Sequence, residues 1–448
     1  MRTEPLPSWP GDPAEALAAY RPESGHGPWN VATAAHLLRR ALGGSSPAER
    51  ARVLEQGPAA ALDALFRPPA PERLERWERL GRRLAPQGIE ALAGWWLLKL
   101  VEAREAPGPR LTLFWHDHFA TSADKVTDTG LLLEQHQTFV RYGEGPFEDL
   151  LRAVAWDPAM LRFLDGDSNR RGLPNENLAR EILELFSLGP GHYTEHDIRE
   201  AARALTGRTV RRGRPVQVPE HHDPGPKTVL GQKVQDGDDL VRVIVAREAC
   251  PRFLIRKLWR FYVSPEPRED CVELLAGRWR EHGLEVRWLV RTLLASRAFF
   301  SREAWRSRVK SPVELVVDAA RAGGLRPDYV ALARACTRMG QSLFRPPGVQ
   351  GWQEGEAWIH SAAWIERCNF AARFAAGGFG SLGLTKDPAG WDRPLLRVLG
   401  GGPAALTRRL ALLFLDRERG SGALEQAGSA DLSSLLQTTL CLPESHLG

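Results

Sequence analysis

A stretch in the middle of the chain, residues 174–207, constrains the fold most, because two apolar helical stripes there enclose a polar run. It reads PNENLAREILELFSLGPGHYTEHDIREAARALTG. Asn177, Glu181 and Glu184 are spaced i, i+4 and i+7, which places them on one face of a helix. The adjacent face is apolar, so these acids lie at the edge of a surface that packs inward. A carboxylate there is costly unless it has a partner, and the pattern therefore predicts a site.

Helical periodicity extends over most of the 448 residues, and no long Ser/Gly/Pro linker divides them. The predicted fold class is mainly α, a multi-helical single large body with a small β-ribbon insertion. We expect an N-terminal arm over residues 1–28, which are rich in Pro and Gly, and a helical domain over residues 29–448. Thr209–Val218 and Thr228–Val234 alternate β-branched with charged side chains and predict the ribbon at about residues 208–235.

Composition excludes several classes of protein. The net charge is +5, but the basic residues are scattered, whereas a nucleic-acid surface needs them on one face, so we do not expect nucleic-acid binding. The five cysteines form no C-x-x-C pair, which argues against a zinc knuckle or a disulfide framework. No apolar run reaches the length of a membrane span, and the N-terminus lacks the apolar core of a signal peptide. These features favour a cytoplasmic protein. A protein partner is compatible with them, although none is identified.

A second polar cluster lies in Leu111–Ser122, LTLFWHDHFATS, where His116 and His118 flank Asp117 among aromatic residues. If this segment is helical, residues two apart point in nearly opposite directions, so only one histidine can face a given site. In an extended backbone both could face it. A single histidine among aromatic residues is also an ordinary core residue.

A third polar cluster lies between the two segments of the predicted ribbon, in residues 220–227, EHHDPGPK. His222, Asp223 and Lys227 sit there on a loop stiffened by Pro and Gly. Imidazole and carboxylate groups on such a loop are a better ligand arrangement than a lone helical histidine.

Several of these motifs together resemble the bacterial family of unknown function DUF1800. They are FWHDHF (Phe114–Phe119), NENLAREILELFSLG with YTEHDIREAARALTG (within Asn175–Gly207), His222–Gly231, VKSPVELV (Val309–Val316), PPGVQGW (Pro346–Trp352) and AAHLLRRALGGSSPAE (Ala34–Glu49). The resemblance covers roughly residues 30 to 440 and implies a mostly helical fold, but no activity. This chain has WHDH where the motif of the family usually reads WHNH, and it has Arg208 where members of the family commonly have a tryptophan. Many relatives are exported, in contrast to the compartment expected here.

The three polar clusters support competing functions. If they converge, His116, His118, Glu181 and His222 would bind a divalent metal such as Zn, Mn or Fe, making the protein a metal-dependent hydrolase. The catalytic residues in this prediction are Glu176, Glu181, Glu184, Asp223 and Lys227. A metal-free alternative is a glycoside hydrolase that uses a pair of carboxyl groups.

The remaining alternative is a scaffold or partner protein with no catalytic role. Arg180 with Glu184, and Arg203 with Glu181, would then be structural ion pairs, and His222 and Asp223 would clamp the turn of the ribbon. An arginine or lysine at each carboxylate would favour this reading, whereas a convergence of donor atoms would favour a metal.

Overall fold

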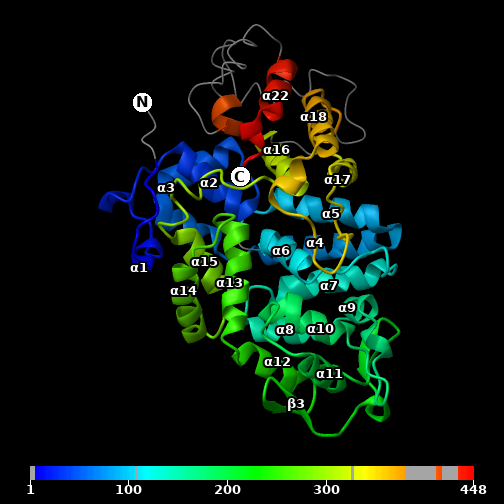
Figure 1. The fold of residues 1–448 in the computed structure, drawn as a ribbon. Helices are drawn as coiled ribbons and strands as arrows, with labels where there is room; N and C mark the ends of the chain where they lie inside the picture. Colours follow the sequence, from blue (N-terminus) through cyan, green and yellow to red (C-terminus); the bar gives the residue numbers. More distant parts are fainter. Residues whose placement is uncertain (1–5, 106–107, 324–326, 380–409, 416–431) are drawn as a thin grey trace.

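The computed structural model describes residues 6–105, 108–323, 327–379, 410–415 and 432–448. Helices make up 62% of the structure, and its strands form two small two-stranded sheets, which confirms the predicted fold class (Figure 1). None of the described helices combines the length and apolarity needed to cross a bilayer.

The helices of the first half of the chain are α1 (Pro13–Ala16), α2 (Val31–Leu42), α3 (Pro47–Leu65), α4 (Pro71–Leu84), α5 (Ile89–Glu102), α6 (Gly108–His118), α7 (Thr129–Tyr142), α8 (Phe147–Ala155), α9 (Pro158–Phe163), α10 (Asn177–Leu183), the π-helical turn η4 (Glu184–Leu188) and α11 (Glu195–Ala204). Four strands follow: β1 (Arg208–Arg211), β2 (Arg214–Gln217), β3 (Lys227–Val229) and β4 (Gln232–Val234). The later helices are α12 (Gly237–Ala246), α13 (Ala249–Tyr262), α14 (Glu269–Glu281), α15 (Val286–Ala295), α16 (Pro312–Gly323), α17 (Tyr329–Arg338), α18 (Ser361–Ala375) and α22 (Leu432–Cys441).

Two clusters of buried apolar side chains form the core of the described residues. The first, which we call core 1, is built mainly by α2, α8, α10, α11 and α12–α15. The second, core 2, is built mainly by α5, α7 and α16–α18 with α22. Helix α6 lies between them in Figure 1, and it contributes Trp115 to core 1 and Leu113 to core 2. Helix α6 is thus one of the elements that core 1 and core 2 share.

The N-terminal arm, described from residue 6 onward, packs along core 1. The Trp9 ring meets Trp259 edge to face, with 6.1 Å between centroids, and its Nε1 donates to the carbonyl oxygen of Ala298. The amide of Tyr20 donates to the carbonyl oxygen of Ala295 at 2.8 Å. These contacts fix the arm against α13 and α15.

The β insertion lies where it was predicted, but its two segments do not pair with each other. Each folds back on itself, β1 on β2 and β3 on β4, as an antiparallel hairpin. The reason is local, because both central residues of each two-residue turn have positive φ: Arg212 and Gly213 (51° and 76°), and Leu230 and Gly231 (50° and 75°). Two-residue turns with positive φ match the twist of a hairpin. The Arg-Gly and Leu-Gly pairs are weaker signals for such a turn than Asn-Gly.

The end of α2 approaches α16 closely because Gly44 has no side chain. Its φ is +151°, and a Cβ there would lie 2.5 Å from the Cα of Asp318. This approach brings the arginines at the end of α2 next to α16.

We therefore expect Gly44→Ala to destabilise the protein by about 2 kcal/mol or more, from backbone strain and the clash with Asp318. The control is Gly277→Ala in α14, where a Cβ meets nothing within 4 Å and φ is ordinary. That change should be neutral or stabilise by about 0.5–1 kcal/mol. Urea unfolding of the two variants measures both effects, and equal stabilities would contradict the close approach of α2 to α16.

Candidate functional site

The two histidines at the end of α6 point into different halves of the core. His116 packs in core 2, with Trp96 and Phe344 at centroid distances of 4.8 and 5.2 Å. His118 packs against core 1, and its Nε2 donates to the carbonyl oxygen of Phe186 at 3.0 Å. Burial lowers the pKa of His116 to about 3 and holds the pKa of His118 well below its usual range. Both rings are therefore neutral near pH 7, and His118 ties α6 to the π-helical turn η4.

Asp117, between the two histidines, anchors the loop that carries the PPGVQGW motif. Its Oδ1 accepts a hydrogen bond of 2.7 Å from the amide of Trp352. The contact is close because Gly351 has φ of +86° and lacks a Cβ, which would lie 2.3 Å from that oxygen. Burial raises the pKa of Asp117 to about 7, although the amide of Trp352 and the charge of Lys257 oppose the rise. Burial in turn lowers the pKa of Lys257. Sequence reasoning selected neither residue.

Two of the predicted catalytic carboxylates are held by arginines. Arg180 is 3.3 Å from Glu176 and 2.9 Å from Glu195, measured between guanidinium nitrogen and carboxylate oxygen. Arg203 donates to Asp223 at 2.8 Å and lowers the pKa of that carboxyl to about 2. Arg180 thus joins its i−4 neighbour Glu176 to Glu195 of α11, and Arg203 joins α11 to Asp223 of the loop 220–227.

The predicted residues of the loop 220–227 also connect segments of the chain. His222 Nδ1 lies 3.0 Å from the carbonyl oxygen of Thr206, at the end of α11. Lys227 Nζ is buried and donates to the carbonyl oxygens of Gly225 and Gln235, at 3.0 and 2.8 Å. These bonds hold the loop and the second hairpin against α11.

Glu181 and Glu184 differ from their neighbours, because no arginine or lysine among the described residues forms an ion pair with either of them. The expected partners, Arg180 and Arg203, pair with other acids. Burial and the nearby charge of Glu184 raise the pKa of Glu181. Glu184 accepts a short hydrogen bond from the hydroxyl of Tyr193. This pair lies at the junction of α10 and η4, and π-helical turns occur frequently at functional sites.

The four residues predicted to bind a metal do not form a recognisable metal site. His116 and His118 point into separate cores, Glu181 lies near the charge of Glu184, and His222 binds the main chain at the end of α11. The described part of the chain contains no group of three or more His, Cys, Asp or Glu side chains placed to hold a metal ion.

A cavity of about 290 Å³ lies between α4, α5, α6 and α7, and Lys99 is one of the residues that line it. The Nζ of Lys99 is 2.7 Å from Nε2 of His136 and 4.7 Å from the ring centroid of Trp95. Burial lowers the pKa of Lys99 to about 7. Sequence reasoning missed this group. Its one signal was a single lysine inside the otherwise apolar segment ALAGWWLLKLVEA.

Comparison with known proteins agrees with the resemblance found in the motifs. The sequence model of a family described as "Protein of unknown function (DUF1800)" matches residues 36–444. No curated protein and no solved structure matches the chain significantly.

The raised pKa of Asp117 predicts how stability depends on pH. Between the ordinary pKa near 4 and the folded value of about 7, the folded protein binds more protons at this position than the unfolded chain does. Its contribution to stability is thus present at low pH and is lost as pH rises through about 7. Asp117→Asn removes this dependence but keeps an oxygen to accept from Trp352, so the variant should be more stable than wild type at pH 8, with little difference at pH 4.

Urea unfolding at a series of pH values measures this difference. Asp117→Ala is the matched control: it also lacks the titrating carboxyl group, but it leaves the amide of Trp352 without its acceptor, so it should be about 1–3 kcal/mol less stable than Asp117→Asn at every pH. Parallel pH profiles for wild type and Asp117→Asn would contradict the raised pKa.

Proposed function

We propose that this chain, which belongs to the DUF1800 family of proteins of unknown function, is a hydrolase that uses Glu181 and Glu184 as a pair of carboxyl groups. The proposal needs no metal, and its substrate class is the glycosidic bond, the reaction for which two such carboxyl groups suffice. A metal-dependent hydrolase would need donor atoms from separate segments to meet, and the described residues provide no such group.

The observation that carries the proposal is the absence of ion pairs at these two acids in the described structure. Glu176, Glu195 and Asp223 nearby all have an arginine within 3.3 Å, as expected of structural acids. Glu181 and Glu184 are partly buried, and burial and the charge of Glu184 raise the pKa of Glu181 more than the charge of Arg180 lowers it. Removing a carboxylate from water without a cation costs free energy, and catalytic sites are where such arrangements are common.

The two carboxyl groups have different surroundings. Glu181 has the raised pKa and keeps its proton to a higher pH, so it is the general acid that protonates the leaving oxygen. Glu184 accepts from Tyr193, whose own pKa is raised by burial and by this bond, so the phenol keeps its proton and remains the donor. Glu184 then attacks the sugar carbon or activates water. The glycosidic C–O bond breaks and one water is consumed.

The helix sets the separation of the two acids. Residues three apart have Cβ atoms about 5–6 Å from each other on one face of a helix. Carboxyl groups on such positions can reach the separations of about 5–10 Å that glycosidases use. The turn η4 carries Glu184, and the bond from His118 to Phe186 fixes this turn to α6. His118 is therefore a positioning residue for Glu184.

A second candidate function is the binding of a small molecule in the cavity beside Lys99. Its volume of about 290 Å³ and its aromatic and basic lining favour this possibility. An amine with a pKa of about 7 would react with a limiting amount of an amine reagent before the other lysines do. Peptide mapping by mass spectrometry should find Lys99 labelled first; labelling of Lys99 last would contradict an accessible cavity.

The proposed hydrolysis is tested with a panel of soluble polysaccharides and aryl glycosides, with released reducing ends or aglycone as the measurement. Glu181→Gln and Glu184→Gln should each lower kcat about 100-fold or more, with little change in Tm. Because the acid must be protonated, activity should fall as pH rises through the raised pKa of Glu181.

The control is Glu176→Gln, one turn away, whose carboxylate is paired with Arg180. This variant should keep its activity. Full activity in Glu181→Gln, or no hydrolysis of any panel member by folded wild-type protein, would contradict the proposal.

A further inference from the structure

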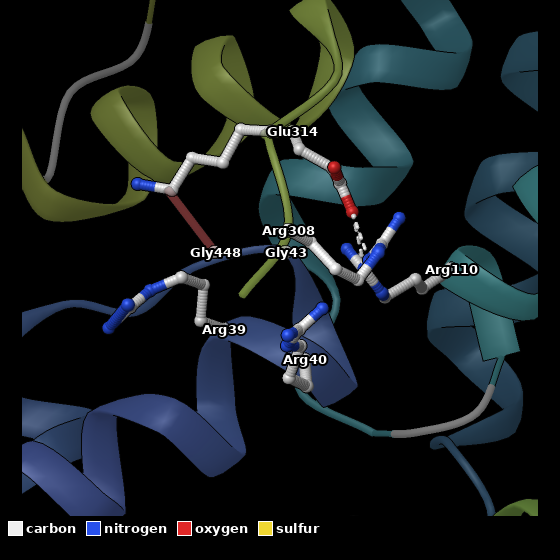
Figure 2. Close-up of a pocket in the computed structure, with 8 residues that line it drawn as sticks. Arg39, Arg40, Gly43, Arg110, Arg308, Glu314 and Gly448 are labelled. Atoms are coloured by element: carbon white, nitrogen blue, oxygen red, sulfur yellow. Dashed lines mark hydrogen bonds and ion pairs between the residues drawn. The ribbon is translucent and has the colours of Figure 1, made fainter. Parts of the chain in front are cut away.

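A small cavity lined mainly by cations lies where α2, α6 and the segment before α16 meet, far from the carboxyl pair in the sequence. Figure 2 shows the residues around it: Arg39, Arg40, Gly43, Arg110, Arg308, Lys310, Glu314 and Gly448. The guanidinium groups of Arg40, Arg110 and Arg308 gather on one side of it, and that of Arg39 points away from them. The centre of a water-sized sphere can move within about 10 Å³ of the cavity, which is room for one small ligand.

The anions around this cavity do not balance the cations. Arg110 and Arg308 share the single carboxylate of Glu314. Lys310 is committed to Asp318 at 2.7 Å. These two carboxylates are thus committed to Arg110, Arg308 and Lys310, and neither forms an ion pair with Arg40.

Arg40 is the least compensated of these cations, because it is about 1% exposed and the described residues offer it no carboxylate in direct contact. Its Nη2 donates to the carbonyl oxygens of Val263 and Ala304, at 3.1 and 2.9 Å, with Ser307 farther away. Burial and the charge of Arg308 lower its pKa, but an arginine does not lose its proton in proteins. A full positive charge therefore stays buried here.

Several N–H groups in this cluster have no acceptor in the described structure. They are Nε and Nη1 of Arg40 and Nε of Arg110, all on buried side chains. An unsatisfied buried donor on a charged group is expensive, and native proteins rarely leave one unpaired. A water molecule could accept from these groups, but it would not offset the charge.

We propose that this cavity binds one monatomic anion of the halide class, with chloride as the physiological ion, held by Arg40 and Arg110. The small size of the cavity excludes polyatomic anions such as phosphate and sulfate. The charge that the ion supplies lets guanidinium groups from α2 and α6 approach each other and the segment that leads into α16. Binding should therefore stabilise the contact between these elements.

The first experiment measures Tm at constant ionic strength while sodium gluconate is replaced by sodium chloride or sodium bromide. Both halides should raise Tm by a few degrees and saturate, since a ligand that binds only the folded state stabilises it according to its occupancy. Arg40→Met, which keeps the volume but removes the charge, should lose this response. Arg334→Met, at an exposed ion pair with Glu90, should keep it.

Bromide diffraction keeps the proposal testable if Arg40→Met does not fold. Crystals of the wild-type protein soaked in sodium bromide should show an anomalous peak between Arg40 and Arg110. The absence of that peak, or a Tm in gluconate equal to that in both halides, would overturn the proposal.

Discussion

A charged side chain taken out of water has to be neutralised, and this requirement organises the centre of the molecule. Helix α16 shows it most plainly. Its Asp318 binds Lys310 at 2.7 Å, and its Arg321 binds Glu49 of α3 at 3.0 Å, with all four side chains almost fully buried. The pair of Arg321 and Glu49 joins α16 to α3, which are distant in sequence. Breaking such a pair strands a buried charge at a cost of about 3–5 kcal/mol, so the pairs fix which elements can be neighbours.

Against this background, the acids without an ion pair are the informative ones. Glu176, Glu195 and Glu200 of the central stretch are paired with arginines. Glu181 instead lies near the charge of Glu184, which accepts from Tyr193. Helix α6 supports this position from the core, where His118 fixes η4 and Asp117 holds the loop of Trp352. An asparagine at position 117 could accept the same bond, so the bond to the loop does not depend on the charge of Asp117.

The sequence predicted the parts of this arrangement that depend on local periodicity. Helical spacing placed Glu181 and Glu184 on one face, and the helical form of α6 separated His116 from His118, as residues two apart must be. It could not predict long-range partners, because the spacing of Arg180 and Glu184 suggested an ion pair while folding brought Glu195 within 2.9 Å of Arg180. Lys99 was missed because its contact with His136 of α7 is also long-range.

The most direct test of the account is a carbon-13 NMR titration of the Glu181 carboxyl in the wild-type protein and in the Glu184→Gln variant. The account predicts a pKa above the ordinary glutamate value in wild type and a lower one in the variant, because the neighbouring negative charge is removed. An ordinary pKa in wild type, or the same raised value in both proteins, would contradict a coupled pair of carboxyl groups.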